Sequence, residues 1–281
     1  MNKLSEKEFV EREFPMSERN FKSIQQLAYS HTGITLSSHK KDMIYGRLSR
    51  RLRKLDLPDF DAYCELLAEN NNQEKIEFVN SITTNLTSFF REEHHFSYLR
   101  NEVIPKLQSS NARTRKLRVW SAGCSTGEEP YSIAMVFASV SSLSNWDVKI
   151  LATDLDSNVV GKAKEGVYAV ERAESVPQEY RKYLLFDKAH KRVKVKDRAK
   201  NLITFKQLNL LHEWPMKGPF DIIFCRNVVI YFDTPTQKVL FSRYADIMRE
   251  GGDLIIGHSE SLHNITNLFR LKGRTIYERV S

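Results

Sequence analysis

The sequence contains few cysteines and no long hydrophobic run. Its 281 residues include three cysteines, and no two of them lie at the spacing of metal ligands. An odd number also argues against a disulfide framework. The first residues are charged and lack the apolar core of a signal peptide, and the apolar runs are far shorter than a membrane span. We therefore expect a cytoplasmic protein without membrane insertion.

The composition is that of a globular protein with a positive net charge. Hydrophobic residues make up 41% and charged residues 28%, which argues against disordered and collagen-like classes. The net charge of +8 is concentrated in two segments. Residues 37–54 carry seven Lys or Arg against one Asp, and residues 181–206 carry ten against two. Such segments indicate an anionic partner, namely nucleic acid, a membrane surface or an acidic protein, or else two solvated faces.

The chain begins with a helical part and then changes to alternating strands and helices. Apolar residues recur at helical spacing up to about residue 80, which predicts a small helical bundle. Its helix at residues 37–55 is amphipathic, with basic residues at Arg47, Arg50, Arg51, Arg53 and Lys54. From about residue 116 the alternation is typical of a parallel α/β sheet. Residues 167–207 break it, and we interpret them as a small antiparallel insertion that includes a strand at residues 202–205.

A glycine loop (residues 123–127) joins a short apolar strand to an apolar helix. Such a junction gathers backbone N–H groups and a helix N-terminus, so it can bind an anion; the alternative is a tight turn without a ligand. The loop has neither the G-x-G-x-x-G pattern nor the Gly-Lys-Ser/Thr of a P-loop, which argues against tight wrapping of a pyrophosphate. Residues 125–129 also have the spacing of a capping box.

Asp154 ends the next predicted strand, 27 residues after Gly127. In a nucleotide-binding βαβ unit, an acid at this place accepts hydrogen bonds from ribose hydroxyls. The alternative role of Asp154, or of Asp156, is to cap the following helix. Together with the glycine loop, Asp154 indicates a ligand that has a ribose and an anionic group. S-adenosylmethionine is such a ligand.

Two further polar segments flank this core. Residues 85–92 mix polar side chains with two phenylalanines and an arginine, and the alternative to a site is an ordinary linker. Residues 225–232 follow a buried strand, at the place where open α/β sheets bind ligands. The alternative there is a loop in which Arg226 and Asn227 satisfy the backbone and Tyr231 packs in the core.

Four segments together resemble the CheR-type chemotaxis receptor methyltransferases. They read TNLTSFFRE, RVWSAGCSTGEEPYSIA, ATDLD and GPFDIIFCRNVVIYFD, in the order and spacing of that family. The resemblance implies an all-helical N-terminal domain (residues 1–83), a linker that contributes to the cofactor site (84–115) and a Rossmann-like α/β methyltransferase domain (116–281) with a β-subdomain inserted at about 167–207. It implies transfer of a methyl group from S-adenosylmethionine to glutamates of methyl-accepting chemotaxis receptors, giving glutamate methyl esters and S-adenosylhomocysteine.

The resemblance also implies roles for single residues. Arg91 and Tyr231 match the family's candidates for acting on the substrate. The implied cofactor contacts are Asn85, Thr87, Arg91, Gly123, Glu129, Asp154, Asn209, Leu210, Arg226 and Asn227. The basic residues of the helix at 37–55 would recognise the receptor. A glutamate acceptor is already ionised at pH 7, so we expect Arg91 to position it and no general base to be required.

Some features limit the resemblance or exclude alternatives. Members that bind a receptor's C-terminal pentapeptide have a glycine-containing hairpin loop, whereas residues 187–191 here are short and lack glycine, so we do not expect tethering to a receptor tail. We expect a monomer that is recruited to membrane receptor arrays. His94 and His95 are adjacent but have no obvious ligand partners, so we expect no metal.

The main alternative function is a nucleic-acid methyltransferase, which would suit the basic segments. Enzymes that methylate amino groups of bases usually carry Asp/Asn-Pro-Pro-aromatic after the fourth strand, where this chain reads CRNV, and the Pro-Cys pair of cytosine-carbon enzymes does not occur. We therefore expect no nucleic-acid partner. The other alternative is an adaptor that has lost turnover, which the presence of all candidate site residues disfavours.

Overall fold

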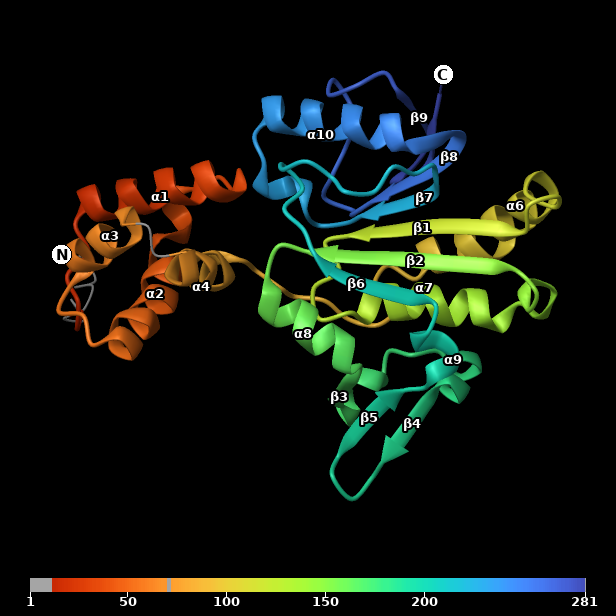
Figure 1. Cartoon of the computed structure of the whole chain (residues 1–281), viewed down its shortest axis with the longest axis horizontal. Helices are drawn as coiled ribbons and strands as arrows, with labels where there is room; N and C mark the ends of the chain where they lie inside the picture. The colour runs from red at the N-terminus through yellow and green to blue at the C-terminus, as the bar shows by residue number, and fades with distance from the viewer. Residues whose placement is uncertain (1–11, 70–71, 281) are drawn as a thin grey trace, which may run out of the picture. The chain divides into compact units, whose positions relative to one another are not determined.

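The computed structural model describes residues 12–69 and 72–280 (Figure 1). The chain forms two compact units. The first unit comprises the residues up to 31 and residues 35–82. The second unit comprises residues 32–34 and the residues from 83 onward. Within the described ranges, no helix has the length and apolar character needed to cross a membrane.

The first unit is helical, as the sequence predicts. Its elements are α1 (Glu18–Thr32), the 3-10 turn η1 (Ser38–Lys40), α2 (Lys41–Leu55), α3 (Phe60–Ala68) and α4 (Asn72–Ile82). Helix α2 buries Ile44, Leu48 and Leu52, which recur every four residues and so lie on one face. The side chain of Asp59 caps α3 by accepting a hydrogen bond from the N–H of Ala62 at 2.9 Å.

The five basic residues of α2 that we expected to recognise the receptor do not share one exposed face. Arg51 is buried, and its guanidinium pairs with the carboxylates of Glu74 and Glu77 on α4. Arg47 donates to the carbonyl of Ile82 at 3.0 Å, at the end of α4. A cation beside the apolar stripe of a packed helix needs such partners, because an unpaired buried charge is costly.

The other three of these five residues are exposed. Arg50, Arg53 and Lys54 are three and four residues apart, so they lie on the same face. Arg53 forms an exposed ion pair with Glu13, whereas no ion pair involves Arg50 or Lys54 in the described part of the chain. Of the five residues predicted to recognise the receptor, only these three therefore form an exposed basic face on α2.

The second unit is built around a seven-stranded sheet of order β6-β2-β1-β7-β8-β10-β9. Neighbouring strands from β6 to β8 are parallel, and β10 is antiparallel to both of its neighbours. This is the predicted Rossmann-like sheet. The strands are β1 (Lys116–Ala122), β2 (Asp147–Asp154), β6 (Ile203–Gln207), β7 (Phe220–Cys225), β8 (Met248–Ile256), β9 (Phe269–Gly273) and β10 (Ile276–Arg279).

Helices cover both faces of this sheet. Along β1, Leu117 and Val119 pack in an apolar cluster with α7 (Glu128–Ser139), whereas Trp120 and Ala122 pack in another cluster with α10 (Thr234–Ile247). Figure 1 shows α7 and α10 on opposite sides of the sheet. Burial on both faces explains why the central strands read as continuous apolar runs.

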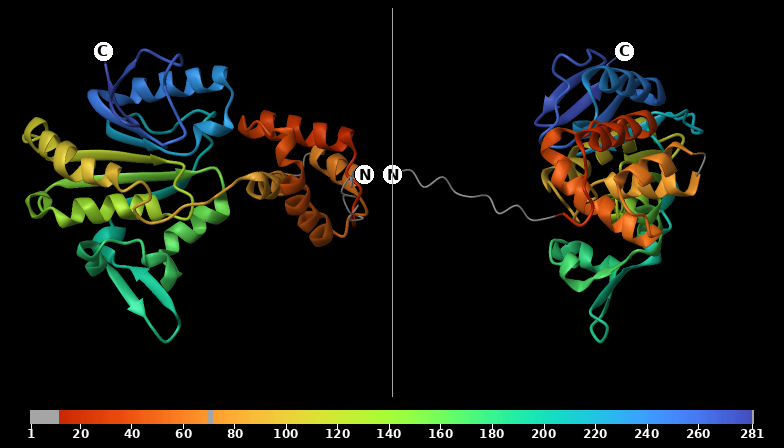
Figure 2. Two further views of the ribbon diagram at one scale, coloured as in Figure 1. Left: turned by 180° about the vertical axis from the view of Figure 1, so that it is seen from behind. Right: turned by 90° about the vertical axis from the view of Figure 1, so that its left-hand side faces the viewer.

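A small antiparallel sheet of order β3-β5-β4 is inserted after α8 (Ser157–Glu165), and Figure 2 shows it projecting from the main sheet. Its elements are β3 (Val167–Ala169), η4 (Val170–Ala173), η5 (Gln178–Tyr183), β4 (Leu184–Asp187) and β5 (Arg192–Val195). The strand predicted at residues 202–205 does not belong to it. That strand is β6, which pairs in parallel with β2 after the short helix α9 (Asp197–Lys200). A short apolar run does not reveal its distant partner, so the sequence could not make this distinction.

Residues 84–115 are not a simple linker. They contain α5 (His94–Tyr98), the π-helical turn η2 (Leu99–Val103) and α6 (Ile104–Ser110). Phe96, Leu99 and Leu107 of these helices are buried in the same cluster as Leu117 and Val119 of β1. This part of the chain therefore belongs to the second unit and helps to cover one face of its sheet.

Candidate functional site

Four parallel strands end at one edge of the main sheet. Ala122 of β1 pairs with Thr153 of β2, and Asp154 pairs with Gln207 of β6, while β7 runs parallel to β1 on its other side. The polar loops after these strands are therefore neighbours: residues 123–127, 154–156, 208–210 and 226–229. The carboxyl edge of such a sheet is where open α/β folds bind ligands.

The glycine loop passes close to the loop after β7. Gly123 has a φ of 110°, and a Cβ atom there would lie 2.3 Å from a methyl carbon of Val228, so only glycine fits. The N–H groups of Gly123 and Cys124 both donate to the carbonyl of Thr153 at 2.8 Å. Gly127, with a φ of 99°, precedes α7, and no side chain caps that helix, so the predicted capping box is wrong.

Asp154 joins the glycine loop to the end of β2. Its carboxylate accepts hydrogen bonds from the N–H of Ser125 at 2.7 Å and of Asp156 at 3.0 Å. Burial raises the pKa of Asp154 to about 6, although these N–H groups favour its charged form. Asp154 does not cap α8, because Asp156 does so by accepting from the N–H of Asn158 at 2.9 Å.

Residues 85–92, hereafter the arginine segment, lie against the glycine loop. The side-chain amide of Asn85 donates to the carboxylate of Asp156 at 2.7 Å, and the backbone carbonyl of Asn85 accepts from the Ser125 hydroxyl at 2.9 Å. Farther along, the N–H of Phe90 donates to the Ser132 hydroxyl on α7 at 3.0 Å. These contacts join residues 40 to 71 positions apart in sequence and bring the arginine segment to the carboxyl edge of the sheet.

Arg91 stands at a strained turn of the arginine segment. Phe90 and Glu92, on either side of it, have φ values of 53° and 59°, in the left-handed region that bulky residues rarely adopt. Strain of this kind is concentrated at functional sites. The Arg91 guanidinium is partly exposed and donates to the carbonyl of Leu86 at 3.0 Å. No carboxylate of the described residues forms an ion pair with it.

Arg226 connects the arginine segment to the sheet. Its buried guanidinium donates to Glu129 at 2.9 Å and to the carbonyl of Arg91 at 2.6 Å, and it lies 3.4 Å from a carboxylate oxygen of Glu92. The other oxygen of Glu129 accepts from the Ser121 hydroxyl at 2.7 Å. Arg226 and Glu129 thus neutralise each other. Both residues were predicted to contact the cofactor, and both side chains form hydrogen bonds with other protein groups.

Glu260 fixes the loop after β7 and was missed in the sequence. Its carboxylate accepts from the N–H groups of Asn227, Val228, Val229 and Gly257 at 2.6–2.9 Å. Burial raises the pKa of Glu260, while these four donors oppose the shift. The only feature of the sequence that could have indicated its role is that Glu260 is an acidic residue shortly after a buried strand.

The other predicted residues are distributed around the same edge. Asn209 bonds within its own loop, where its side chain accepts from the N–H of Leu211 at 2.9 Å, and Leu210 is buried against Trp120. The carbonyl of Thr87 accepts from Arg172 at 2.9 Å. Tyr231 lies partly exposed in η6 (Val229–Tyr231), directly after the loop that Glu260 holds.

The histidine pair has a third potential metal ligand after all. Ligand atoms of Glu92, His94 and His95 lie within 4.8 Å of one another. However, Glu92 is already close to Arg226 and to the His258 ring, at 2.9 Å from the latter. Burial, and then the positive charges of Arg226, His94 and Arg274, lower the pKa of His95 to about 2. Because cationic groups surround the cluster, we retain the expectation that it binds no metal.

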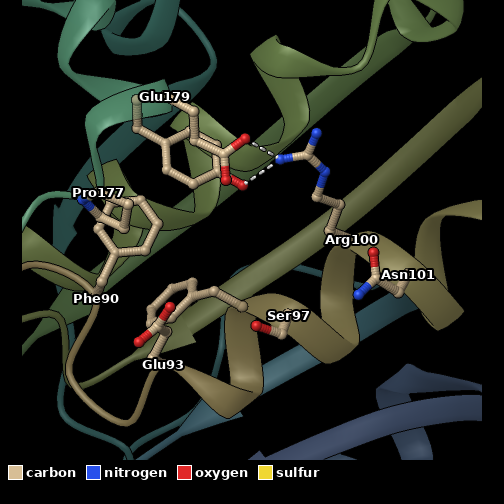
Figure 3. Close-up of a pocket in the computed structure, with 9 residues that line it drawn as sticks. Phe90, Glu93, Ser97, Arg100, Asn101, Pro177 and Glu179 are labelled. Carbon is tan, nitrogen blue, oxygen red and sulfur yellow. Dashed lines mark hydrogen bonds and ion pairs between the residues drawn. The ribbon is translucent and has the colours of Figure 1, made fainter.

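A cavity of about 430 Å³ lies beside α5 and η2 (Figure 3). It is lined by Phe90 but by no residue that the sequence predicts to bind the cofactor. Figure 3 shows Arg100 pointing toward Glu179, to which it is bonded at 2.5 Å, and Arg100 also bonds the Tyr180 hydroxyl at 3.1 Å. Phe90 of the arginine segment is the one lining residue that the cavity shares with the carboxyl edge described above.

Comparison with known families decides the identity of this fold. The model of the CheR methyltransferase SAM binding domain matches residues 85–277, and that of the CheR methyltransferase all-alpha domain matches residues 19–83. The chain belongs to the CheR methyltransferase family. It is an S-adenosylmethionine-dependent protein-glutamate O-methyltransferase of chemotaxis, which confirms the predicted activity and cofactor.

Individual CheR relatives resemble the chain over most of its length. A probable chemotaxis protein methyltransferase of Rhizobium etli is 44% identical over 239 residues, which cover 83% of this chain and 89% of the relative. The chemotaxis protein methyltransferase of Escherichia coli is 42% identical, covering 93% and 91%. Chemotaxis protein methyltransferase 2 of Pseudomonas aeruginosa is 41% identical, covering 96% of each chain.

Proposed function

We propose that this CheR methyltransferase binds S-adenosylmethionine at the carboxyl edge of the sheet, between the glycine loop, Asp154 and the arginine segment. The observation that carries this proposal is the meeting of these parts through the hydrogen bonds of Ser125 to Asp154 and Asn85. Two features fit the cofactor. The Asp154 carboxylate retains lone pairs for ribose hydroxyls, and Gly127 leaves the first backbone N–H groups of α7 without a side-chain cap.

The cofactor supplies a methyl group on a sulfonium, and the chain supplies the alignment of the acceptor. An ionised glutamate needs a cationic hydrogen-bond donor to hold it, and the planar guanidinium of Arg91 is suited to that role. Its lack of an ion-pair partner among the described residues supports this assignment. Tyr231 would donate a second hydrogen bond to the acceptor. Arg226 would position Arg91, since its guanidinium donates a hydrogen bond to the backbone carbonyl of Arg91.

For the receptor, we propose recognition by the exposed basic face of α2, formed by Arg50, Arg53 and Lys54. An acidic helix of a chemoreceptor is a complementary partner, and such fields mainly raise the association rate. The short turn between β4 and β5 supports binding that does not depend on a receptor tail. We propose that the enzyme acts as a cytoplasmic monomer at membrane receptor arrays.

The test of the Arg91 role is transfer of labelled methyl groups to a chemoreceptor cytoplasmic fragment. Arg91→Ala is expected to lower turnover roughly 100-fold or more, because the acceptor loses its alignment. Arg113→Ala is the matched control, since Arg113 is an exposed arginine of the same unit. Near-normal turnover of Arg91→Ala with an active wild type would remove Arg91 from the reaction.

A further inference from the structure

Arg172 reaches from the small antiparallel subdomain back to the methyl-transfer site. It lies in η4, directly after β3. One nitrogen of its guanidinium donates both to the carbonyl of Thr87 at 2.9 Å and to the carboxylate of Glu128 at 2.7 Å. Thr87 belongs to the arginine segment, and Glu128 begins α7. A single side chain of the subdomain therefore bridges two parts of the site.

The carboxylate of Glu128 needs the positive charge of Arg172. The Glu128 side chain is fully buried, whereas that of Arg172 is 44% exposed. The carboxylate also accepts from the Thr126 hydroxyl at 2.6 Å, but Arg172 is its ion-pair partner among the described residues. A buried carboxylate without a counter-charge is unfavourable, so loss of Arg172 would force Glu128 to rearrange. That rearrangement would take place at the N-terminus of α7.

Tyr168 makes a second, parallel link from the same subdomain. Its hydroxyl donates to the carbonyl of Thr126 in the glycine loop at 2.7 Å. Its ring packs edge-on against Phe89 of the arginine segment, with centroids 5.0 Å apart. The base of the subdomain thus contacts both the glycine loop and the arginine segment. The subdomain is part of the scaffold of the site.

We propose that Arg172 is a positioning residue for methyl transfer, which holds the arginine segment against the first turn of α7. The proposal rests on the role assigned above to Arg91, four residues beyond Thr87 in the same segment. Arg172 does not act on the acceptor itself; it fixes the backbone from which the Arg91 guanidinium projects. Displacement of a catalytic group by about 1 Å can lower a rate roughly 100-fold, so a backbone anchor of this kind is sufficient to control turnover.

The experiment combines Arg172→Ala, Arg172→Lys and the double variant Arg172→Ala/Glu128→Gln with the full-length enzyme. Arg172→Ala is expected to lower kcat on a receptor fragment by roughly 10- to 100-fold. It is also expected to accelerate hydrogen exchange of residues 85–92. Arg172→Lys, which keeps the charge, and the double variant, which removes the unpaired carboxylate, should each recover part of the lost kcat. A merely structural role would lower the melting temperature without such a change in kcat of the folded enzyme.

Arg181→Ala is the matched control within the subdomain. Its guanidinium donates to the carbonyls of Val176 and Glu174 and not to the arginine segment or α7, so turnover and exchange should match the wild type. An active wild type with Arg172→Ala and Arg172→Lys at unchanged kcat and unchanged exchange would overturn the positioning role alone. A wild type without activity on the receptor fragment would instead overturn the proposed function. If Arg172→Ala does not fold, Arg172→Lys and the double variant decide by the same two readouts.

Discussion

Asp154 is a residue whose charge state should control cofactor binding. In the free protein its pKa is raised to about 6 by burial, so it becomes protonated as the pH falls through that value. Ribose hydroxyls bind more strongly to the ionised carboxylate. Affinity for S-adenosylhomocysteine should therefore fall below pH 6, approaching a tenfold loss per pH unit.

Calorimetric titrations from pH 5 to pH 8 measure this dependence. Asp154→Asn, which cannot ionise, should bind more weakly at pH 8 and lose the pH dependence. Affinity that is the same in the wild type at both ends of the range would show that Asp154 does not bind the ribose in its charged form.

Glu260 shows why single residues of the site escape sequence analysis. Its four backbone partners lie three residues before it and about thirty residues before it, and only the folded sheet brings them together. The same holds for Arg172, which meets Glu128 across 44 residues. Residues at the ends of strands, such as Asp154, were accessible because a strand end is a local feature.

A prediction at the scale of one loop concerns Glu260→Ala, which leaves four N–H groups of the loop after β7 without their acceptor. The loss should reduce the free energy of unfolding by about 3 kcal/mol, because unsatisfied buried donors are costly. Urea denaturation measures it, with the exposed Glu250→Ala as control. A change as small as that of Glu250→Ala would mean that the loop does not depend on this carboxylate.

At the scale of elements, strands and helices were predicted where apolar patterns are local. β1, β2 and β7 are bounded apolar runs, and α1 to α4 have clear helical spacing. The partner of β6 and the packing of α5 and α6 were not predictable, because both depend on contacts with distant strands. Helix α2 combines both cases. Its amphipathic face was predicted, but the burial of Arg51 was not, because its ion-pair partner Glu74 lies 23 residues away.

The exposed face of α2 leads to a prediction about receptor binding. Arg50→Glu/Lys54→Glu should raise the KM for the receptor fragment and weaken its salt dependence, since complementary charge is lost. Affinity for S-adenosylhomocysteine should not change. The control is Arg19→Glu/Lys22→Glu on α1, which changes the net charge equally at exposed positions of the same unit. If both double variants have the same KM and salt slope, α2 is not the recognition element.

For the whole molecule, the proposed cofactor site is assembled from five segments that are distant in sequence. They are the arginine segment, the glycine loop, and the loops after β2, β6 and β7. Parallel pairing of β6, β2, β1 and β7 places four of them at the same edge, and the bonds of Asn85 and Arg226 bring the fifth. The family resemblance indicated these segments in advance, and the hydrogen bonds explain how they are joined.

The most direct test is hydrogen–deuterium exchange of the wild-type enzyme with and without S-adenosylhomocysteine. Protection on binding is expected to be concentrated in residues 85–92, 123–127, 154–156, 208–210 and 226–229. Protection confined to residues 93–101 and 177–180, which hold the other lining residues of the cavity beside Arg100, would contradict a cofactor site at this edge. So would an absence of protection from these five segments while the ligand is bound.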